Sequence, residues 1–128
     1  MIGVVKWFWF VIFEGCVPDS FCRLVEDFNG VILARYGGLI CFSFDGDVGV
    51  FERIVCDGFN LRFYMYSDDL FDVFRFVVRK LGYFMDLYFN VKSDLEDMFR
   101  DLSRIYRFSR SGRIRRLVRK WLGVKNFG

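Results

Sequence analysis

One apolar run near the start of the chain restricts the fold more than any other feature. Residues Val4–Phe13 have the sequence VVKWFWFVIF, in which only Lys6 is polar. A helix that crosses a bilayer needs about 20 apolar residues, so this run is too short to span a membrane. A signal peptide is not expected either, because no charged leader precedes the run and no small-residue cleavage site follows it. Aromatic and β-branched residues favour a buried strand here.

The residues after this run predict one helix followed by a β-hairpin. Apolar side chains recur at positions 21, 24, 25 and 28, which is a helical spacing, and Asp19 and Ser20 precede them as N-cap residue types. Asn29-Gly30 is expected to end the helix. Two apolar runs with Gly37-Gly38 between them then predict two strands, Val31–Tyr36 and Leu39–Phe44.

The middle of the chain predicts further strands. Asp45-Gly46-Asp47 has the composition of a turn between strands, and it leads into Val48–Cys56. Asn60–Tyr66 alternates in the period of a half-buried strand. Its aromatic residues could stack on bases, as on an RNA-recognition sheet, but packing in the core is the favoured interpretation.

The strongest helical stripe covers Leu70–Leu81, with Ser67-Asp68-Asp69 as its expected cap and Gly82 at its end. The remaining expected elements are a strand over Tyr83–Val91 and a helix that opens at a Ser93/Glu96 capping box and runs through Leu102.

These elements predict an α+β fold. Up to Val91 the order is β-α-β-β-α-β if the middle strands merge into two long bent ones, which is compatible with a ferredoxin-like body. A chain of 128 residues corresponds to one such domain. We therefore expect an α+β body over residues 1–103 and a basic strand or helix extension over residues 104–128.

Charge is divided unevenly between these two parts. Residues 1–101 carry 10 basic and all 16 acidic side chains, a net charge of −6. Residues 102–128 carry nine basic and no acidic side chains, a net charge of +9. Such asymmetry is typical of a basic arm that binds nucleic acid or another anionic surface.

Six arginines of the extension repeat every third residue from Arg104 to Arg119. On an α-helix this repeat drifts by about 60° per step, so the arginines would surround the segment and suit RNA packed around it. The guanidinium fork also binds phosphate bidentately and stacks on bases. The predicted RNA-binding residues are Arg104, Arg107, Arg110, Arg113, Arg115, Arg116, Arg119, Lys120 and Lys125.

Two other interpretations of the extension stay open. Ile114, Leu117, Val118 and Trp121 form an apolar stripe, so Arg113–Leu122 is predicted as a helix after Gly112. A basic amphipathic helix of this kind also suits a membrane surface or a groove on a partner protein. The same pattern is equally compatible with an ordinary solvated helix at the end of the chain.

Nothing in the sequence indicates catalysis. The chain has no histidine, which excludes histidine-based acid–base chemistry and Ser-His or Cys-His nucleophiles. The paired aspartates lie where turns and helix N-termini use them for backbone reasons. The four cysteines form no CxxC pair and are expected to be buried thiols in apolar strands. We therefore expect no enzyme, no cofactor and no metal.

The residues that are rare suggest where the gene lies. Thr, Gln and His are absent and there is one Pro, whereas Phe, Val, Gly, Leu, Cys and Trp make up about half of the chain. Codons for the abundant set can be written with T and G alone, which indicates a strongly biased coding strand such as an organelle genome, an edited transcript or a small virus. A mitochondrially encoded protein needs no transit peptide, so the mitochondrial matrix is the expected compartment.

The segment Ser111-Gly112-Arg113-Ile114, with Arg116 and Arg119 downstream, resembles a turn in the universal family of the third protein of the small ribosomal subunit. Phe74-Arg75 and Lys80 resemble an upstream helix of that family. The family's post-turn glycine is replaced by arginine here, and its GxxG loop is not visible. The resemblance implies a reduced, mitochondrially encoded member such as kinetoplastids carry, which contacts ribosomal RNA in the small subunit without catalysis.

Together these features predict a structural RNA-binding protein of a mitochondrial small ribosomal subunit, with ribosomal RNA and neighbouring ribosomal proteins as partners and no membrane insertion. The alternatives are a matrix-side accessory subunit of a respiratory complex and a small viral nucleic-acid-binding protein.

Overall fold

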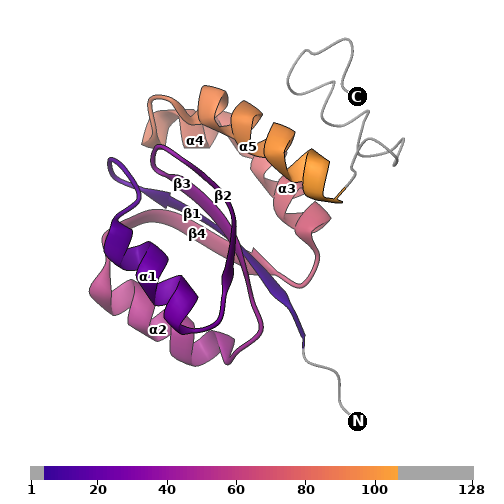
Figure 1. The fold of residues 1–128 in the computed structure, drawn as a ribbon. Coiled ribbons are helices and arrows are strands. Elements are labelled where there is room, and N and C mark those ends of the chain that lie inside the picture. The colour runs from indigo at the N-terminus through magenta and orange to yellow at the C-terminus, as the bar shows by residue number, and fades with distance from the viewer. Residues whose placement is uncertain (1–4, 107–128) are drawn as a thin grey trace.

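The chain folds into three layers in the computed structural model, which describes residues 5–106 (Figure 1). A four-stranded antiparallel sheet lies between two helices on one face and three helices on the other. In chain order the elements are β1 (Trp7–Phe13), α1 (Asp19–Asp27), β2 (Val31–Tyr36), β3 (Leu39–Phe44), α2 (Val48–Gly58), β4 (Leu61–Ser67), α3 (Leu70–Arg79), α4 (Leu81–Leu87) and α5 (Val91–Tyr106).

The strand order in the sheet is β2-β3-β1-β4, and every neighbouring pair is antiparallel. The predicted α+β class is therefore confirmed. The order β-α-β-β-α-β is also present, but it ends earlier than predicted. Its second helix is α2 and its last strand is β4, which ends at Ser67, whereas the prediction extended the order to Val91. Three further helices come after β4, and they cover the second face of the sheet.

Alternation along the central strands divides the buried side chains between two cores. On β1, Trp9 and Val11 pack toward α1 and α2, whereas Phe10 and Ile12 pack toward α3, α4 and α5. All six residues of β3 are buried. A strand covered on both faces needs apolar side chains at almost every position. This explains why the first apolar run of the sequence lacks the polar alternation of a half-exposed strand.

The elements up to Phe44 follow the sequence prediction closely. Both hairpin strands have the predicted bounds. The first helix is present, but Pro18 is its N-cap residue and makes no side-chain hydrogen bond, while Asp19 is already helical. The first strand begins at Trp7 and not at Val4, which lies outside the described residues.

The prediction of a turn between strands at Asp45-Gly46-Asp47 was wrong, because α2 comes directly after it. The Asp47 carboxylate accepts a hydrogen bond from the Val50 backbone N–H at 3.1 Å and caps the helix. Phe51 and Val55 are buried on one side of α2, four residues apart. The β-branched residues of this segment favour a strand locally. The four-residue spacing of its buried apolar side chains instead matches a helix that packs on the sheet.

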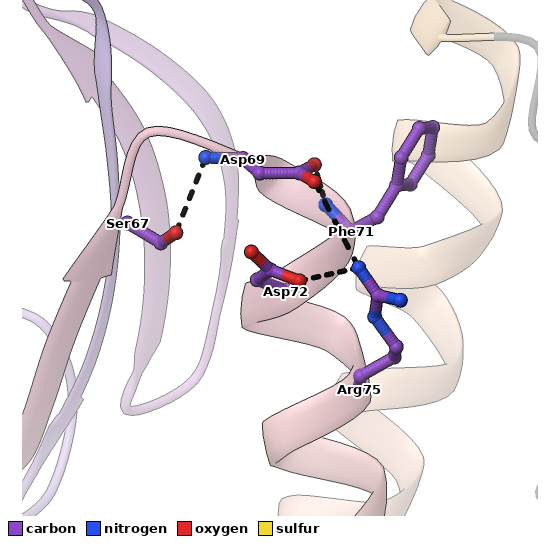
Figure 2. A network of polar contacts seen from close by, with 5 residues as sticks. All are labelled: Ser67, Asp69, Phe71, Asp72 and Arg75. Carbon is purple, nitrogen blue, oxygen red and sulfur yellow. Dashed lines mark hydrogen bonds and ion pairs between the residues drawn. The ribbon is translucent and has the colours of Figure 1, made fainter.

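The cap of α3 is confirmed, and Figure 2 shows its polar network. Asp69 accepts from the Phe71 backbone N–H at 2.9 Å, and the Ser67 hydroxyl accepts from the Asp69 N–H at 3.2 Å. Arg75, one turn further on, pairs with Asp72 and lies 3.8 Å from the Asp69 carboxylate. The helix ends at Arg79, two residues before the predicted end.

The predicted strand over Tyr83–Val91 was also wrong. Its first half belongs to α4, where Phe84 is buried against the rings of Phe10 and Phe63. Helix α5 then begins at Val91, so Ser93 is a helical residue and not an N-cap. Among residues 5–106, no helix is both long and apolar enough to cross a membrane.

Candidate nucleic-acid interface

Helix α5 carries the chain from the body into the basic segment. Its buried residues recur at helical spacing and face the sheet: Val91, Leu95, Met98, Phe99 and Leu102. The helix continues to Tyr106, so the expected boundary between residues 103 and 104 falls inside it. The start of the basic segment is therefore part of the packed body.

Arg104 is the one predicted RNA-binding residue that the structure describes. It lies in the last turn of α5, its side chain is 74% exposed, and its guanidinium is 4.0 Å from the Asp101 carboxylate. A cation in the last turn also complements the helix dipole. The other predicted residues lie outside the described residues: Arg107, Arg110, Arg113, Arg115, Arg116, Arg119, Lys120 and Lys125. The Ser111–Ile114 turn and the predicted helix Arg113–Leu122 also lie there.

A second exposed arginine, Arg100, lies one turn before Arg104 and was not predicted. Its side chain is 58% exposed and its guanidinium is 3.1 Å from the Asp97 carboxylate. Residues four apart share one side of a helix, so both arginines face outward together. Their i, i+4 spacing was visible in the sequence. This pair was missed because all residues before 104 were assigned to an acidic body.

A hydrogen bond holds the C-terminal half of α5 against the sheet. The Tyr36 hydroxyl, at the end of β2, donates to the Asp101 carboxylate. The pKa of Tyr36 is raised, mainly because ionisation would break this bond and to a lesser extent because of burial. Asp101 thus lies between the sheet and Arg104 and links the last turns of α5 to β2.

The N-terminal half of α5 is fixed to the β2–β3 turn. The Tyr88 hydroxyl donates to Asp94 at 2.6 Å and accepts from the Gly38 backbone N–H at 2.8 Å. A side chain at Gly37 would overlap the Tyr88 hydroxyl, and Gly37 also has a φ of 56° that suits glycine. Helix α5 is therefore anchored to the sheet at both of its halves.

The aromatic side chains of β4 pack against both cores of the sheet. Tyr64 and Tyr66 stack on Trp9 in one core, and Phe63 packs on Phe76 and Phe84 in the other. The favoured interpretation, packing in the core, is confirmed for these three rings, which are half-buried against the two cores. Base stacking on an exposed sheet needs an uncovered aromatic face, whereas helices pack on both faces here and leave hollows beside β4 among the described residues.

Thiols and carboxylates form no metal centre in the described part of the chain. Within residues 5–106 no group of three or more Cys, Asp or Glu side chains could hold a metal ion. Cys22 and Cys41 are buried, as expected of structural thiols, although Cys22 lies in a helix and not in a strand. Cys16 and Cys56 are exposed, contrary to the prediction.

Comparison with known proteins gives no relative. No protein-family description, curated protein or solved structure matches this chain.

Proposed function

We propose that this chain is a non-enzymatic, structural RNA-binding protein, most consistent with a component of a mitochondrial small ribosomal subunit. The observation that carries the proposal is the separation of charge: −6 over residues 1–101 and +9 over residues 102–128. In this proposal the basic segment contacts ribosomal RNA, and the body docks on neighbouring proteins. Ser111-Gly112-Arg113-Ile114, through its resemblance to the ribosomal family, favours this RNA over others.

The arrangement of the body supports assigning RNA contact to the segment after α5. A net-negative body repels phosphates, and helices pack on both faces of its sheet. Arg100 and Arg104 are exposed side by side on a helix that is fixed to the sheet and leads into the segment. RNA bound to the segment would thereby be held at a defined position relative to the body.

Binding of a ribosomal RNA fragment by the full chain, measured over a range of salt concentrations, tests the RNA contact. About seven phosphate contacts give a slope of log K against log salt of roughly −5 to −6, and removing one phosphate contact makes the slope shallower by about 0.7–0.9. The test variant replaces three arginines of the segment by glutamine: Arg107, Arg110 and Arg113. We expect its slope to be shallower by about 2 to 3.

The matched control removes the same number of charges from the body. It replaces by glutamine three exposed arginines on helices of the body other than α5: Arg23, Arg53 and Arg79. We expect this control to bind with the slope of the unmodified chain. Equal losses of affinity in both variants would contradict a localised RNA contact and indicate only a general effect of net charge.

Sedimentation of a native mitochondrial extract, with and without ribonuclease, tests the assignment to the ribosome. We expect the chain to migrate with the small subunit and to leave it after ribonuclease or high salt. Migration with a membrane complex that resists ribonuclease would instead favour the accessory subunit of a respiratory complex. Binding to RNA in isolation without ribosome association would favour the viral alternative.

A further inference from the structure

A hollow lined by aromatic rings lies beside strand β4, on the face of the sheet that α3 and α4 cover. Its volume is ≈ 180 Å³. Pockets for drug-sized ligands measure about 300–1,000 Å³, so this space suits a single ring and not a whole cofactor. We call it the aromatic hollow, and five residues line it: Phe63, Phe76, Lys80, Tyr83 and Phe84.

The rings of the aromatic hollow combine a packed wall with an accessible surface. Phe63 stacks on Phe76 at a centroid distance of 5.9 Å with the planes 9° apart, and it contacts the buried ring of Phe84 at 4.8 Å. Tyr83 differs from these rings because it is 54% exposed. Exposed aromatic rings bind single-stranded nucleic acid by stacking on its bases. Tyr83 therefore presents a surface on which a flat ligand can stack.

The aromatic hollow is cationic, although the body as a whole is acidic. Lys80 is the single charged residue that lines it, and no ion pair among residues 5–106 includes this exposed lysine. The hollow on the other side of β4 differs, because its one cation, Arg62, pairs with Glu14 at 3.2 Å. Lysine binds phosphate as a point charge. An unpaired lysine beside flat rings thus suits a ligand that has both an aromatic ring and a negative charge.

We propose that the aromatic hollow binds one unpaired base of single-stranded RNA, which stacks on Tyr83 while the phosphate of the same nucleotide pairs with Lys80. A nucleotide has a flat ring and an anion in one small unit, and the volume of the hollow limits the contact to one base. Bases inside a duplex are stacked and paired, so the site selects loops, bulges and ends. This inference rests on the proposed RNA binding and adds a contact on the body.

The aromatic hollow is separate from the basic segment. It lies beside β4 at one edge of the sheet, whereas α5, which leads into the segment, packs along β2 at the other edge. Three strand spacings place these edges about 14 Å apart. Substitutions at distant sites that share no partner have nearly additive effects. The contribution of the hollow can therefore be measured without changing the segment.

The first test titrates the full chain, freed of RNA by ribonuclease, with adenosine 5′-monophosphate and with adenosine. The ring signals of ¹³C-labelled tyrosine report the site, and Tyr83→Phe identifies those of Tyr83. We expect the monophosphate to shift these signals and to bind a few-fold more tightly than adenosine at low salt. Lys80→Gln should remove this preference. Arg79→Gln should keep it, because this neighbouring exposed cation does not line the hollow.

The second test measures the binding of a single-stranded ribosomal RNA fragment by Tyr83→Ala. Loss of one stacked base should weaken binding by about fivefold or more. The salt slope should stay unchanged, because stacking releases no counterions, whereas the arginine variant of the segment makes the slope shallower. Phe89→Ala, at an aromatic residue that is 95% exposed and does not line the hollow, is the matched control and should bind like the unmodified chain.

The outcomes separate this inference from the proposed function. Unchanged Tyr83 signals, with Tyr83→Ala binding RNA like the unmodified chain, would overturn the inference and leave the RNA contact of the segment intact. Binding of the monophosphate at Tyr83 by a chain without RNA affinity would support a nucleotide site and contradict the proposed function. A shift of the Tyr83 signals by phenylacetate and not by the monophosphate would overturn the inference in favour of an acidic protein partner. If Tyr83→Ala does not fold, the comparison of monophosphate with adenosine decides.

Discussion

The Tyr88 hydroxyl connects Asp94 on α5 to the β2–β3 turn. It donates to the Asp94 carboxylate at 2.6 Å and accepts from the Gly38 N–H at 2.8 Å, so a single oxygen joins segments 50 residues apart in the sequence. The pKa of Tyr88 is raised, first because of burial and then because ionisation would break the bond to Asp94. This contact determines where α5 lies on the sheet.

Tyr88→Phe should lower the free energy of unfolding by about 1–3 kcal/mol, because it leaves the Gly38 N–H and the Asp94 carboxylate without this partner. Urea unfolding measures the change. Tyr83→Phe, at a half-exposed tyrosine of α4, is the matched control and should change the value by less than about 0.5 kcal/mol. Equal effects of the two substitutions would contradict an anchoring role for Tyr88.

Phe51 is the residue through which α2 enters the core. Its ring contacts those of Trp9, Phe28, Phe42 and Phe44 at centroid distances of 4.6–5.8 Å. Phe51→Ala should lower the free energy of unfolding by about 3–5 kcal/mol, because it leaves a cavity among these rings. Phe89→Ala removes the same atoms at a side chain that is 95% exposed and should have little effect in the same urea titration.

Asp47 determines where α2 begins. Asp47→Ala should cost about 1 kcal/mol, because the Val50 N–H loses the carboxylate that caps it. Hydrogen exchange of the Val50 amide should accelerate in this variant. Asp45→Ala, at an exposed residue two positions earlier, is the control. If segment 48–56 were a strand, the two substitutions would have similar effects on Val50.

Burial of Cys41 makes the stability fall at alkaline pH. Burial raises the pKa of this thiol from 9.0 to about 12, so above pH 9 the unfolded chain releases a proton that the folded chain retains. The resulting contribution to stability is fully present below pH 9 and is lost as the pH rises from 9 to 12, by at most about 1.4 kcal/mol per pH unit. Cys41→Val should therefore flatten the decline of unfolding free energy over this range, whereas Cys16→Val, at an exposed thiol, should not.

Arg100 should contribute to RNA affinity if the basic segment binds RNA. It lies one turn before Arg104 on the outer side of α5, so RNA held at the end of the helix would be within reach of both. We expect Arg100→Gln to weaken binding a few-fold at low salt and to make the salt slope shallower by about 0.7–0.9. Arg53→Gln, an exposed arginine on α2, should leave both quantities unchanged in the same filter-binding titration.

Local sequence signals determined the elements up to Phe44 and the cap of α3. The hairpin strands are bounded by turn residues, and Gly37 has the positive φ that such a turn uses. Asp69 at the start of a strong helical stripe fixed the beginning of α3. In each case a short-range hydrogen bond or backbone preference favours the same structure as the apolar period. The charge division around residue 101 likewise follows from the sequence alone.

The tertiary structure decided the segments whose local signals conflict. Val48–Cys56 is rich in strand-forming residues, yet its apolar side chains at 51 and 55 match the spacing of a helix on the sheet. Segment 83–91 has no clear hydrophobic period. Phe84 lies in a helix because its ring packs on Phe10 and Phe63, on the face of the sheet that this helix covers. The placement of β4 beside β1 likewise depends on how the buried side chains of the two strands pack together. Short-range patterns do not encode it, because the contacts that stabilise it join residues about 55 positions apart.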